Sequence, residues 1–202
     1  EYLKGKKVGL GYKTQIDWCT TPSFLIKHGW NIFEHVNIEY MGTNHSTRAL
    51  LDGTIDVALI DAYLNPSTGE VAPGRPTIRL IGSEKKFYHI PWGKKAIQKT
   101  AEQVGYPLEA VTIPEGSFNG WLKQDIPTWV YANGFAVRDT FPKEIAYEIV
   151  KLYINSVQKF GEYHKLGKIM TKDMLSYGYT EQDLHPGAVE AYEDAGLDIP
   201  EK

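Results

Sequence analysis

The chain has 202 residues, of which 42% are hydrophobic, 23% charged and 12% aromatic, with 19 Gly and 11 Pro. These proportions are typical of folded globular proteins, and they exclude disordered and collagen-like chains. The 22 Lys and Arg against 25 Asp and Glu give a formal charge of −3, so we expect no nucleic-acid partner. The single cysteine, Cys19, cannot form an intrachain disulfide, and the fold therefore depends on its hydrophobic core.

The first part of the chain alternates strand and helix signals. Segments rich in β-branched residues or closed by Gly or Asp predict strands at 7–11, 36–41, 55–61 and 78–82. Between them, Pro22 and Gly29 bracket a short helix, and residues 47–52 form another that ends at Gly53. This alternation predicts an α/β fold with a mostly parallel sheet flanked by helices, and a ligand crevice at the carboxyl ends of the strands.

The second part predicts longer elements. A helix over 94–104 is followed by a turn-rich loop at 113–120 and a long strand over 129–137. A helix then begins near Pro142, with an apolar stripe at helical spacing, and a last helix opens at Pro186 and closes at Gly196. The stripe consists of Ile145, Ile149, Tyr153, Val157 and Phe160.

Motifs for catalysis and for metal binding are incomplete. Thr14 replaces the third glycine of a dinucleotide fingerprint after the first strand, and Ser117 lacks the glycine two positions before it that a nucleophile elbow needs. The six histidines have no spacing typical of metal ligands, and His185 suits a helix entry bonded to local backbone. We therefore expect binding without catalysis, with no cofactor and no metal.

Five segments follow the pattern of one family in order and spacing, and together they cover nearly the whole chain. They resemble the TAXI-type solute receptors of TRAP transporters, within the type II periplasmic binding protein fold. The tail, with Tyr192, Gly196 and Leu197 after 184–188, is the most specific of them. The segments are residues 3–8, 51–58, 113–118 with Gly120, 141–149 and 184–188.

The resemblance implies an extracytoplasmic receptor, secreted by an upstream signal peptide that this chain does not include. Such a receptor captures a small organic anion or an amino acid between two lobes and delivers it to TRAP membrane subunits. Residues 4–127 would form the second lobe, and residues 128–202 would contribute to the first. The resemblance also implies that the opening strands and helices of the first lobe, and half of the cleft, lie outside the chain.

The candidate ligand contacts combine hydrogen-bonding groups with aromatic rings at strand ends and loops, where α/β proteins form their crevices. Each residue also suits a structural role; Asp61, for example, suits the capping of local N–H groups. The candidates are Thr14, Gln15, Asp61, Tyr63, Phe118, Trp129 and Tyr131. Residues 14–17 replace the small-residue turn that is common in the family, which argues against glutamate and favours a less polar or aromatic organic acid.

Two other functions stay open at this stage. The same fold serves as the effector-sensing module of cytoplasmic transcription regulators, and that function needs a helix-turn-helix segment upstream. An enzyme on this scaffold is the third alternative. It is the least supported, because the sequence offers no nucleophile paired with a base.

Overall fold

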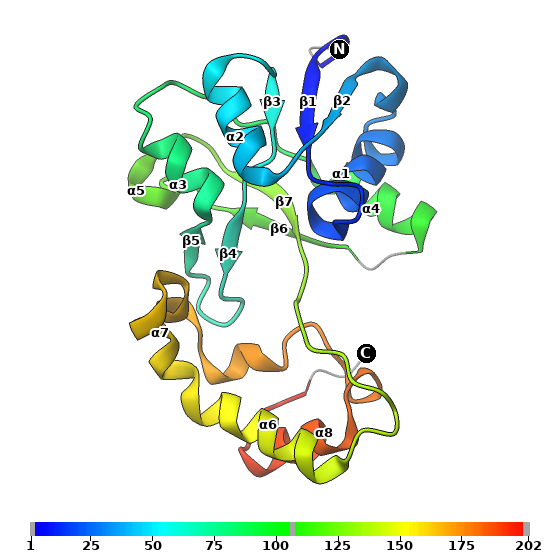
Figure 1. Cartoon of the computed structure of the whole chain (residues 1–202), viewed down its shortest axis with the longest axis vertical. Helices are drawn as coiled ribbons and strands as arrows, with labels where there is room; N and C mark the ends of the chain where they lie inside the picture. Colours follow the sequence, from blue (N-terminus) through cyan, green and yellow to red (C-terminus); the bar gives the residue numbers. More distant parts are fainter. Residues whose placement is uncertain (1–2, 106–107, 200–202) are drawn as a thin grey trace. The chain divides into compact units, whose positions relative to one another are not determined.

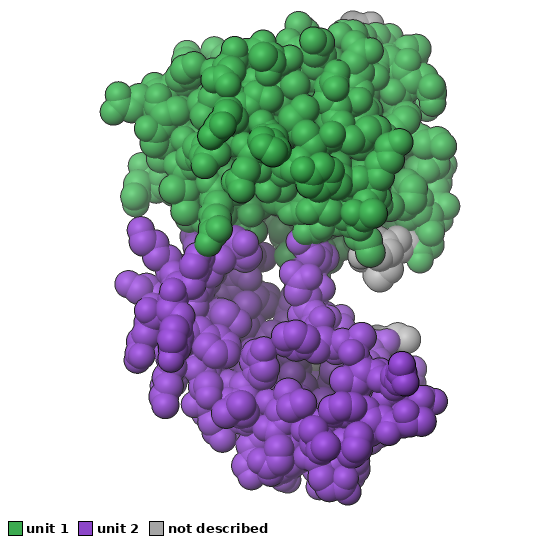
Figure 2. Space-filling view, in the orientation of Figure 1, with its two compact units in different colours: residues 1–62, 73–130 green, residues 63–72, 131–202 purple. Residues whose placement is uncertain are grey.

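The computed structural model describes residues 3–105 and 108–199. The chain divides into two compact units, coloured separately in Figure 2. Unit 1 comprises residues 1–62 and 73–130, and unit 2 comprises residues 63–72 and 131–202. The division into lobes between residues 127 and 128 remains a prediction.

Unit 1 is built around a three-stranded parallel sheet in the order β2-β1-β3 (Figure 1). In the central strand, Val8 lies opposite Ile38 on one side and Val57 on the other. Because it has neighbours on both sides and helices over the sheet, its residues 8–10 are all buried. The predicted α/β fold with a parallel sheet is confirmed. The strands are β1 (Lys7–Leu10), β2 (Asn37–Tyr40) and β3 (Val57–Ala58).

The core of unit 1 forms where helical segments pack on the sheet. Val8, Leu10 and Ile26 are buried together, and the indoles of Trp30 and Trp92 stack beside them with ring centroids 4.5 Å apart. Trp30 Nε1 also donates to the Trp92 carbonyl at 2.9 Å. The helical segments are η1 (Ile16–Thr20), α1 (Thr21–Phe24), η2 (Leu25–Gly29), η3 (Phe33–His35), α2 (Thr43–Asp52) and α4 (Lys94–Val104).

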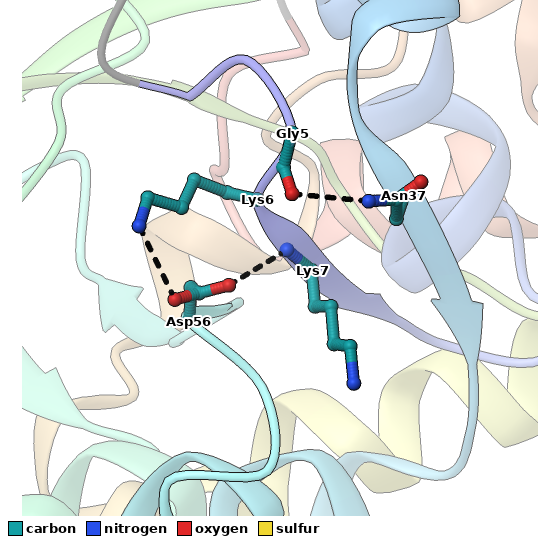
Figure 3. A network of polar contacts seen from close by, with 5 residues as sticks. All are labelled: Gly5, Lys6, Lys7, Asn37 and Asp56. Atoms are coloured by element: carbon teal, nitrogen blue, oxygen red, sulfur yellow. Dashed lines mark hydrogen bonds and ion pairs between the residues drawn. The ribbon is translucent and has the colours of Figure 1, made fainter.

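Polar contacts join the strands at the amino edge of the sheet (Figure 3). Asp56 accepts a hydrogen bond from the Lys7 backbone N–H at 2.9 Å, and its other oxygen lies 3.6 Å from Lys6 Nζ. Asn37 Nδ2 donates to the Gly5 carbonyl at 3.0 Å. The bond from Lys7 holds the pKa of Asp56 below its usual value. These side chains support the strand register and lie at the edge opposite the predicted crevice.

The other strands form two smaller, two-stranded sheets. β6 pairs antiparallel with β7, with Ala110 opposite Trp129, and β4 pairs with β5. Between β6 and β7, Phe118 and Asn119 both have φ of 58°, which makes the predicted loop a tight, left-handed turn. The elements are β4 (Ala62–Leu64), β5 (Val71–Pro73), β6 (Glu109–Ile113), α5 (Ser117–Gly120) and β7 (Ile126–Val130).

Three predicted strands need correction. Residues 78–82 do not form a strand. They lie in and after helix α3 (Arg75–Ile81), which has Pro76 in its first turn, buries Thr77 and Leu80 and exposes Ile78. The strand predicted at 55–61 is reduced to the two residues of β3. The strand predicted at 129–137 is β7, which begins earlier, at Ile126, and ends at Val130, opposite Glu109 of β6.

Unit 2 is mostly helical, and its core lies between α6 and α8. Ile154 packs there with Ala188 and Tyr192. Gly187 lets the two helices approach closely, since a Cβ at this position would meet the Lys143 carbonyl. Both predicted helices are confirmed. The elements are α6 (Lys143–Ser156), η4 (Val157–Lys159), α7 (Phe160–Tyr163), η5 (Lys165–Ile169), η6 (Lys172–Leu175), η7 (Glu181–Asp183) and α8 (Pro186–Asp194).

The apolar stripe predicted on this helix does not form one buried face. Val157 is fully buried, but Ile145 and Ile149 are exposed, and the core face of α6 runs instead through Ala146 and Ile154. Within residues 3–105 and 108–199, no helix is long and apolar enough to cross a membrane.

Candidate functional site

The turn that follows β1 is fixed by its own backbone and by one side chain. Gly11 N–H donates to the Trp18 carbonyl at 2.7 Å, and Tyr12 N–H donates to Gln15 Oε1 at 2.9 Å. Gln15 N–H returns a bond to the Tyr12 carbonyl at 2.8 Å. The Gln15 amide oxygen therefore holds the turn, and the turn leaves Thr14 exposed at the carboxyl edge of the sheet.

The amino terminus of α2 lies at the same edge, directly after β2. Gly42 is its N-cap and supplies no side-chain cap, and the His45 and Ser46 N–H groups bond the Gly42 carbonyl at 2.9 Å each. Among the described residues, the N–H groups of Thr43 and Asn44 have no hydrogen-bond acceptor. Free N–H groups and the helix dipole make this end partly positive, which favours an anionic group.

Side chains from two other elements add to this positive end. Lys13 Nζ lies 4.7 Å from the ring centroid of Tyr40, the last residue of β2. The Tyr12 hydroxyl is 3.1 Å from the place that a Cβ on Gly42 would take, so Tyr12 covers the start of α2. Arg79 Nη1 donates to the Asn44 carbonyl at 3.5 Å. These contacts connect the ends of β1 and β2 and bring two cations to them.

Asp61 follows β3 at this edge and has the opposite charge. Its backbone carbonyl accepts from Gly74 N–H at 3.1 Å and from Thr77 Oγ1 at 2.6 Å. Its carboxyl group lies where a Cβ on residue 74 would be, so only glycine fits there. In the described part of the chain, no group donates to the buried Oδ1. The hydrogen bonds from Gly74 and Thr77 thus go to the backbone carbonyl of Asp61, and the carboxyl Oδ1 accepts none from the described residues.

Burial controls the charge of this carboxyl group. The pKa of Asp61 is raised to about 6, mainly by removal from solvent; a hydrogen bond with its own backbone acts against this rise, and the nearby charge of Asp17 adds to it. At neutral pH the group carries a charge that lacks full solvation, so a cationic or N–H donor group from a ligand would stabilise it. The crevice edge of unit 1 therefore has a positive side, at the ends of β1 and β2, and a negative side, at the end of β3.

The predicted contact residues do not all lie at this edge. Thr14, Gln15 and Asp61 follow neighbouring strands of the parallel sheet, whereas Trp129 lies on β7 of the antiparallel pair. Phe118 is in the left-handed turn of α5. Tyr63, on β4, and Tyr131 belong to unit 2, where their side chains are 43% and 39% exposed.

Sequence reasoning missed Tyr12, Lys13, Gly42 and Gly74 as parts of this edge. Gly42 carried a usable signal, because a glycine between a predicted strand and a helix start is typical of a backbone that approaches a ligand. The place of Gly74 beside Asp61 had no such signal, since it depends on α3, which was predicted as a strand.

The described residues offer no metal site, because no three His, Cys, Asp or Glu side chains among them lie close enough to hold a metal ion. Cys19, the single cysteine, is buried.

His185 has the helix-entry role predicted for it: its Nδ1 accepts from Gly187 N–H at 3.2 Å, and its Nε2 lies 3.1 Å from the Phe141 carbonyl.

Comparison with protein families agrees with this architecture. The model of the NMT1-like family matches residues 1–196. The chain belongs to the NMT1-like family. This family is periplasmic-binding-protein-like, which gives the chain a general role in solute binding and points to a location outside the cytoplasm. NMT1-like binding proteins are typically not enzymes. Among curated proteins, no sequence matches the chain.

Proposed function

We propose that this NMT1-like chain is an extracytoplasmic receptor that captures a small organic anion or an amino-acid-like solute and delivers it to a TRAP-type permease. Membership of a periplasmic-binding-protein-like family supports capture of a solute. The edge of the parallel sheet supports the place of capture, because polar groups from three successive strand ends lie there. The candidate contacts at this edge are Thr14, Gln15 and Asp61; Phe118 and Trp129 are the other candidates in unit 1.

The observation that carries the choice of solute is the partly exposed carboxyl group of Asp61, whose buried Oδ1 has no donor in the described part of the chain. A plain organic anion would bring a second negative charge to Asp61 and to the nearby Asp17. An amino-acid-like solute can instead direct its ammonium group to Asp61 and its carboxylate to the free N–H groups of Thr43 and Asn44. Of the two classes, the amino-acid-like solute therefore fits this edge better.

Exposed rings and aliphatic side chains around these charges favour a solute with an apolar part. Tyr12 is 52% exposed, Tyr40 41% and Ile16 60%, and all three lie on or after the ends of β1 and β2. Amphipathic rings supply contact area together with a polar group. An aromatic or aliphatic amino acid is thus a better match than a small, fully polar one.

Thermal-shift titration of the full chain tests this function with a matched series. Phenylalanine has both charged groups, 3-phenylpropionate lacks the amine, and 2-phenylethylamine lacks the carboxylate. We expect phenylalanine, or another common amino acid, to raise the melting temperature more than either truncated analogue. Equal stabilisation by the deaminated acid would show that the receptor takes plain anions. If no amino acid and no organic acid stabilised the chain, capture of a solute at the crevice edge of unit 1 would be contradicted.

Two variants separate recognition from folding. Asp61→Asn removes the charge opposite the ammonium group and should weaken binding by roughly 10-fold to 100-fold, which is the range for hydrogen bonds to charged groups. Asp52→Asn is the matched control, because Asp52 is an exposed carboxylate at the far end of α2. Equal affinities of both variants and the parent chain would remove Asp61 from the site.

The permease partner rests on the resemblance to TAXI-type receptors and needs its own experiment. Proteoliposomes that contain a TRAP permease should take up the labelled solute only when the receptor is added. Binding without such uptake would leave the receptor function in place and exclude the tested permease as its partner.

A further inference from the structure

The hairpin of β4 and β5 connects Asp61 with a buried asparagine near its turn (Figure 1). The two strands pair, and because only residues 65–70 separate them, they are antiparallel. Asn65 N–H donates to the Glu70 carbonyl at 2.9 Å, and Gly74 N–H donates to the Asp61 carbonyl at 3.1 Å. Asp61 lies four residues before Asn65, and Gly74 lies four residues after Glu70, so both bonds belong to one strand register.

This register determines where the Asp61 carboxyl group lies. The group lies where a Cβ on residue 74 would be, so the residue opposite Asp61 has to be glycine. A slip of one residue would bring Pro73 or Arg75 opposite Asp61 instead. Both carry a Cβ, and Pro73 has no N–H for the Asp61 carbonyl. The place of the carboxyl group at the crevice edge therefore depends on the hairpin register, which is set at the turn.

The side chain of Asn65 holds this turn. Its Oδ1 accepts from Ser67 N–H at 2.9 Å and from Thr68 N–H at 3.2 Å. The Asn65 carbonyl accepts from Gly69 N–H at 2.8 Å, and Gly69 has a φ of 72°, in the left-handed region. Asparagine favours such turns because its short side chain can bond the backbone two residues on. Asn65 thus fixes the turn that gives it Glu70 as its partner.

The same side chain is anchored in unit 2. Asn65 is fully buried, and its Nδ2 donates to the Ile169 carbonyl at 2.7 Å and to Thr171 Oγ1 at 3.1 Å. The amide oxygen therefore faces N–H donors and the amide nitrogen faces acceptors, so all of these bonds agree with one orientation of the amide. An apolar residue at this position would leave the Ile169 carbonyl without its partner. The turn of the hairpin is thus held by bonds on both sides of one amide.

We propose that Asn65 is a positioning residue for Asp61: by holding the turn of the hairpin, it keeps Gly74 opposite Asp61 and the carboxyl group at the crevice edge. Asn65 touches no solute and acts only through the strand register. The inference deepens the proposed function and rests on it, because Asp61 is the proposed partner of the ammonium group of the solute.

Titration of the Asp61 carboxyl group, followed by carbon NMR of the full chain without solute, tests this positioning. The pKa of Asp61 is raised to about 6 in the parent chain. Asn65→Ala should lower this pKa toward the ordinary 3.8, because a loosened hairpin exposes the carboxyl group to solvent. Asn65→Ser should keep most of the raised pKa, since its hydroxyl group can accept from the same turn N–H groups.

Gly69→Val loosens the same turn without a change in the core. Gly69 is exposed, and a Cβ on it would meet no atom within 4 Å, but a β-branched residue is strained at its positive φ. This variant should therefore lower the pKa of Asp61 as well. If both Asn65→Ala and Gly69→Val left that pKa unchanged, the proposal would be overturned.

Ser176→Ala is the matched control for a general loss of stability in unit 2. Ser176 is also buried there, and its Oγ donates to the Asp198 carbonyl at 2.9 Å, outside the hairpin. The variant should lower the melting temperature and leave the pKa of Asp61 in place. An equal fall of the pKa in Ser176→Ala and Asn65→Ala would show that Asn65 has no specific effect on Asp61.

Solute binding then separates this inference from the proposed function. Asn65→Ala should weaken the binding of phenylalanine about 10-fold, but it should have no further effect in an Asp61→Asn background, since both changes act on one group. An undiminished effect in that background would count against the proposal. If the parent chain bound no amino acid, the proposed function would fail, whereas a lowered pKa in Asn65→Ala would still support the positioning of Asp61 by Asn65.

Discussion

Units 1 and 2 both expose large apolar side chains, but they do so in different surroundings. In unit 1, Tyr12 and Ile16 lie at strand ends beside charged groups such as Lys13 and Asp61. In unit 2, Ile145, Ile149 and Leu152 are exposed along one side of α6, at a spacing of four and three residues. A mixed surface fits a small solute that has both a charged and an apolar part. A line of aliphatic side chains without a charged group among them does not.

The largest expected effect is on the free energy of unfolding, and it distinguishes a buried leucine from an exposed one. Leu10 in unit 1 is fully buried, whereas Leu152 in unit 2 is 65% exposed. Leu10→Ala should lower the free energy of unfolding by about 2–5 kcal/mol, because it leaves a cavity in the core. Leu152→Ala should change it by less than about 0.5 kcal/mol in the monomer. Urea unfolding at low protein concentration measures both, and similar losses would contradict the exposed position of Leu152.

A smaller effect tests the packing of the negative side of the crevice edge. A methyl group on residue 74 would collide with the Asp61 carboxyl group, so Gly74→Ala should cost about 1–3 kcal/mol. Shortening the partner with Asp61→Ala should recover part of this loss in a double-mutant cycle. Additive losses in urea unfolding would mean that the two residues are not in contact.

The charge on Asp61 makes stability depend on pH in a defined direction. Burial raises its pKa from 3.8 to about 6, so between these values the folded chain binds more protons than the unfolded chain. The contribution of Asp61 to the free energy of unfolding therefore falls as the pH rises from 3.8 to about 6. At pH above this window, Asp61→Asn should be more stable than the parent by about 1 kcal/mol, a value discounted for solvent screening.

The difference between Asp61→Asn and the parent should vanish below pH 3.8, where both states of the parent are protonated. Urea unfolding across the pH range measures this difference. Exposed Asp52 has no comparable burial, and Asp52→Asn is the control. A constant difference at all pH values would show that the pKa of Asp61 is not raised.

The smallest effect concerns the helix entry in unit 2. His185 caps α8 by accepting from Gly187 N–H, and its other ring nitrogen lies near the Phe141 carbonyl. His185→Ala should cost about 1 kcal/mol, and His185→Asn should restore most of this, because asparagine is a good N-cap. Both values come from thermal unfolding. If both variants lost the same stability, His185 would stabilise the fold through its contact with the Phe141 carbonyl and not as the cap of α8.

Local signals were sufficient for much of the fold. The helix over 94–104 could be predicted because its ends and its spacing are both encoded within the segment. Residues 78–82 could not, because their β-branched composition competes with Pro76, and the helix start decided the outcome. The predicted strand at 129–137 failed beyond Val130, since a strand requires a partner that no local pattern can specify.

The candidate site also has residues that could be predicted from the sequence and residues that could not. The rule that ligands bind at the carboxyl ends of parallel strands led to Thr14, Gln15 and Asp61. The contacts of Tyr12 with Gly42 and of Asp61 with Gly74 join residues that are far apart in the sequence, and only the folded chain brings them together. The unused carboxyl oxygen of Asp61 is likewise a property of packing.

Hydrogen exchange of the full chain, with and without a saturating amino acid from the thermal-shift series, tests the central claim most directly. If the solute binds at the crevice edge of unit 1, exchange should slow at the Thr43 and Asn44 amides, which have no acceptor within the described structure. The turn at 12–15 should slow with them, and exchange in α6 should be unaffected. Slower exchange elsewhere, with 12–15 and 43–44 unchanged, would contradict the account.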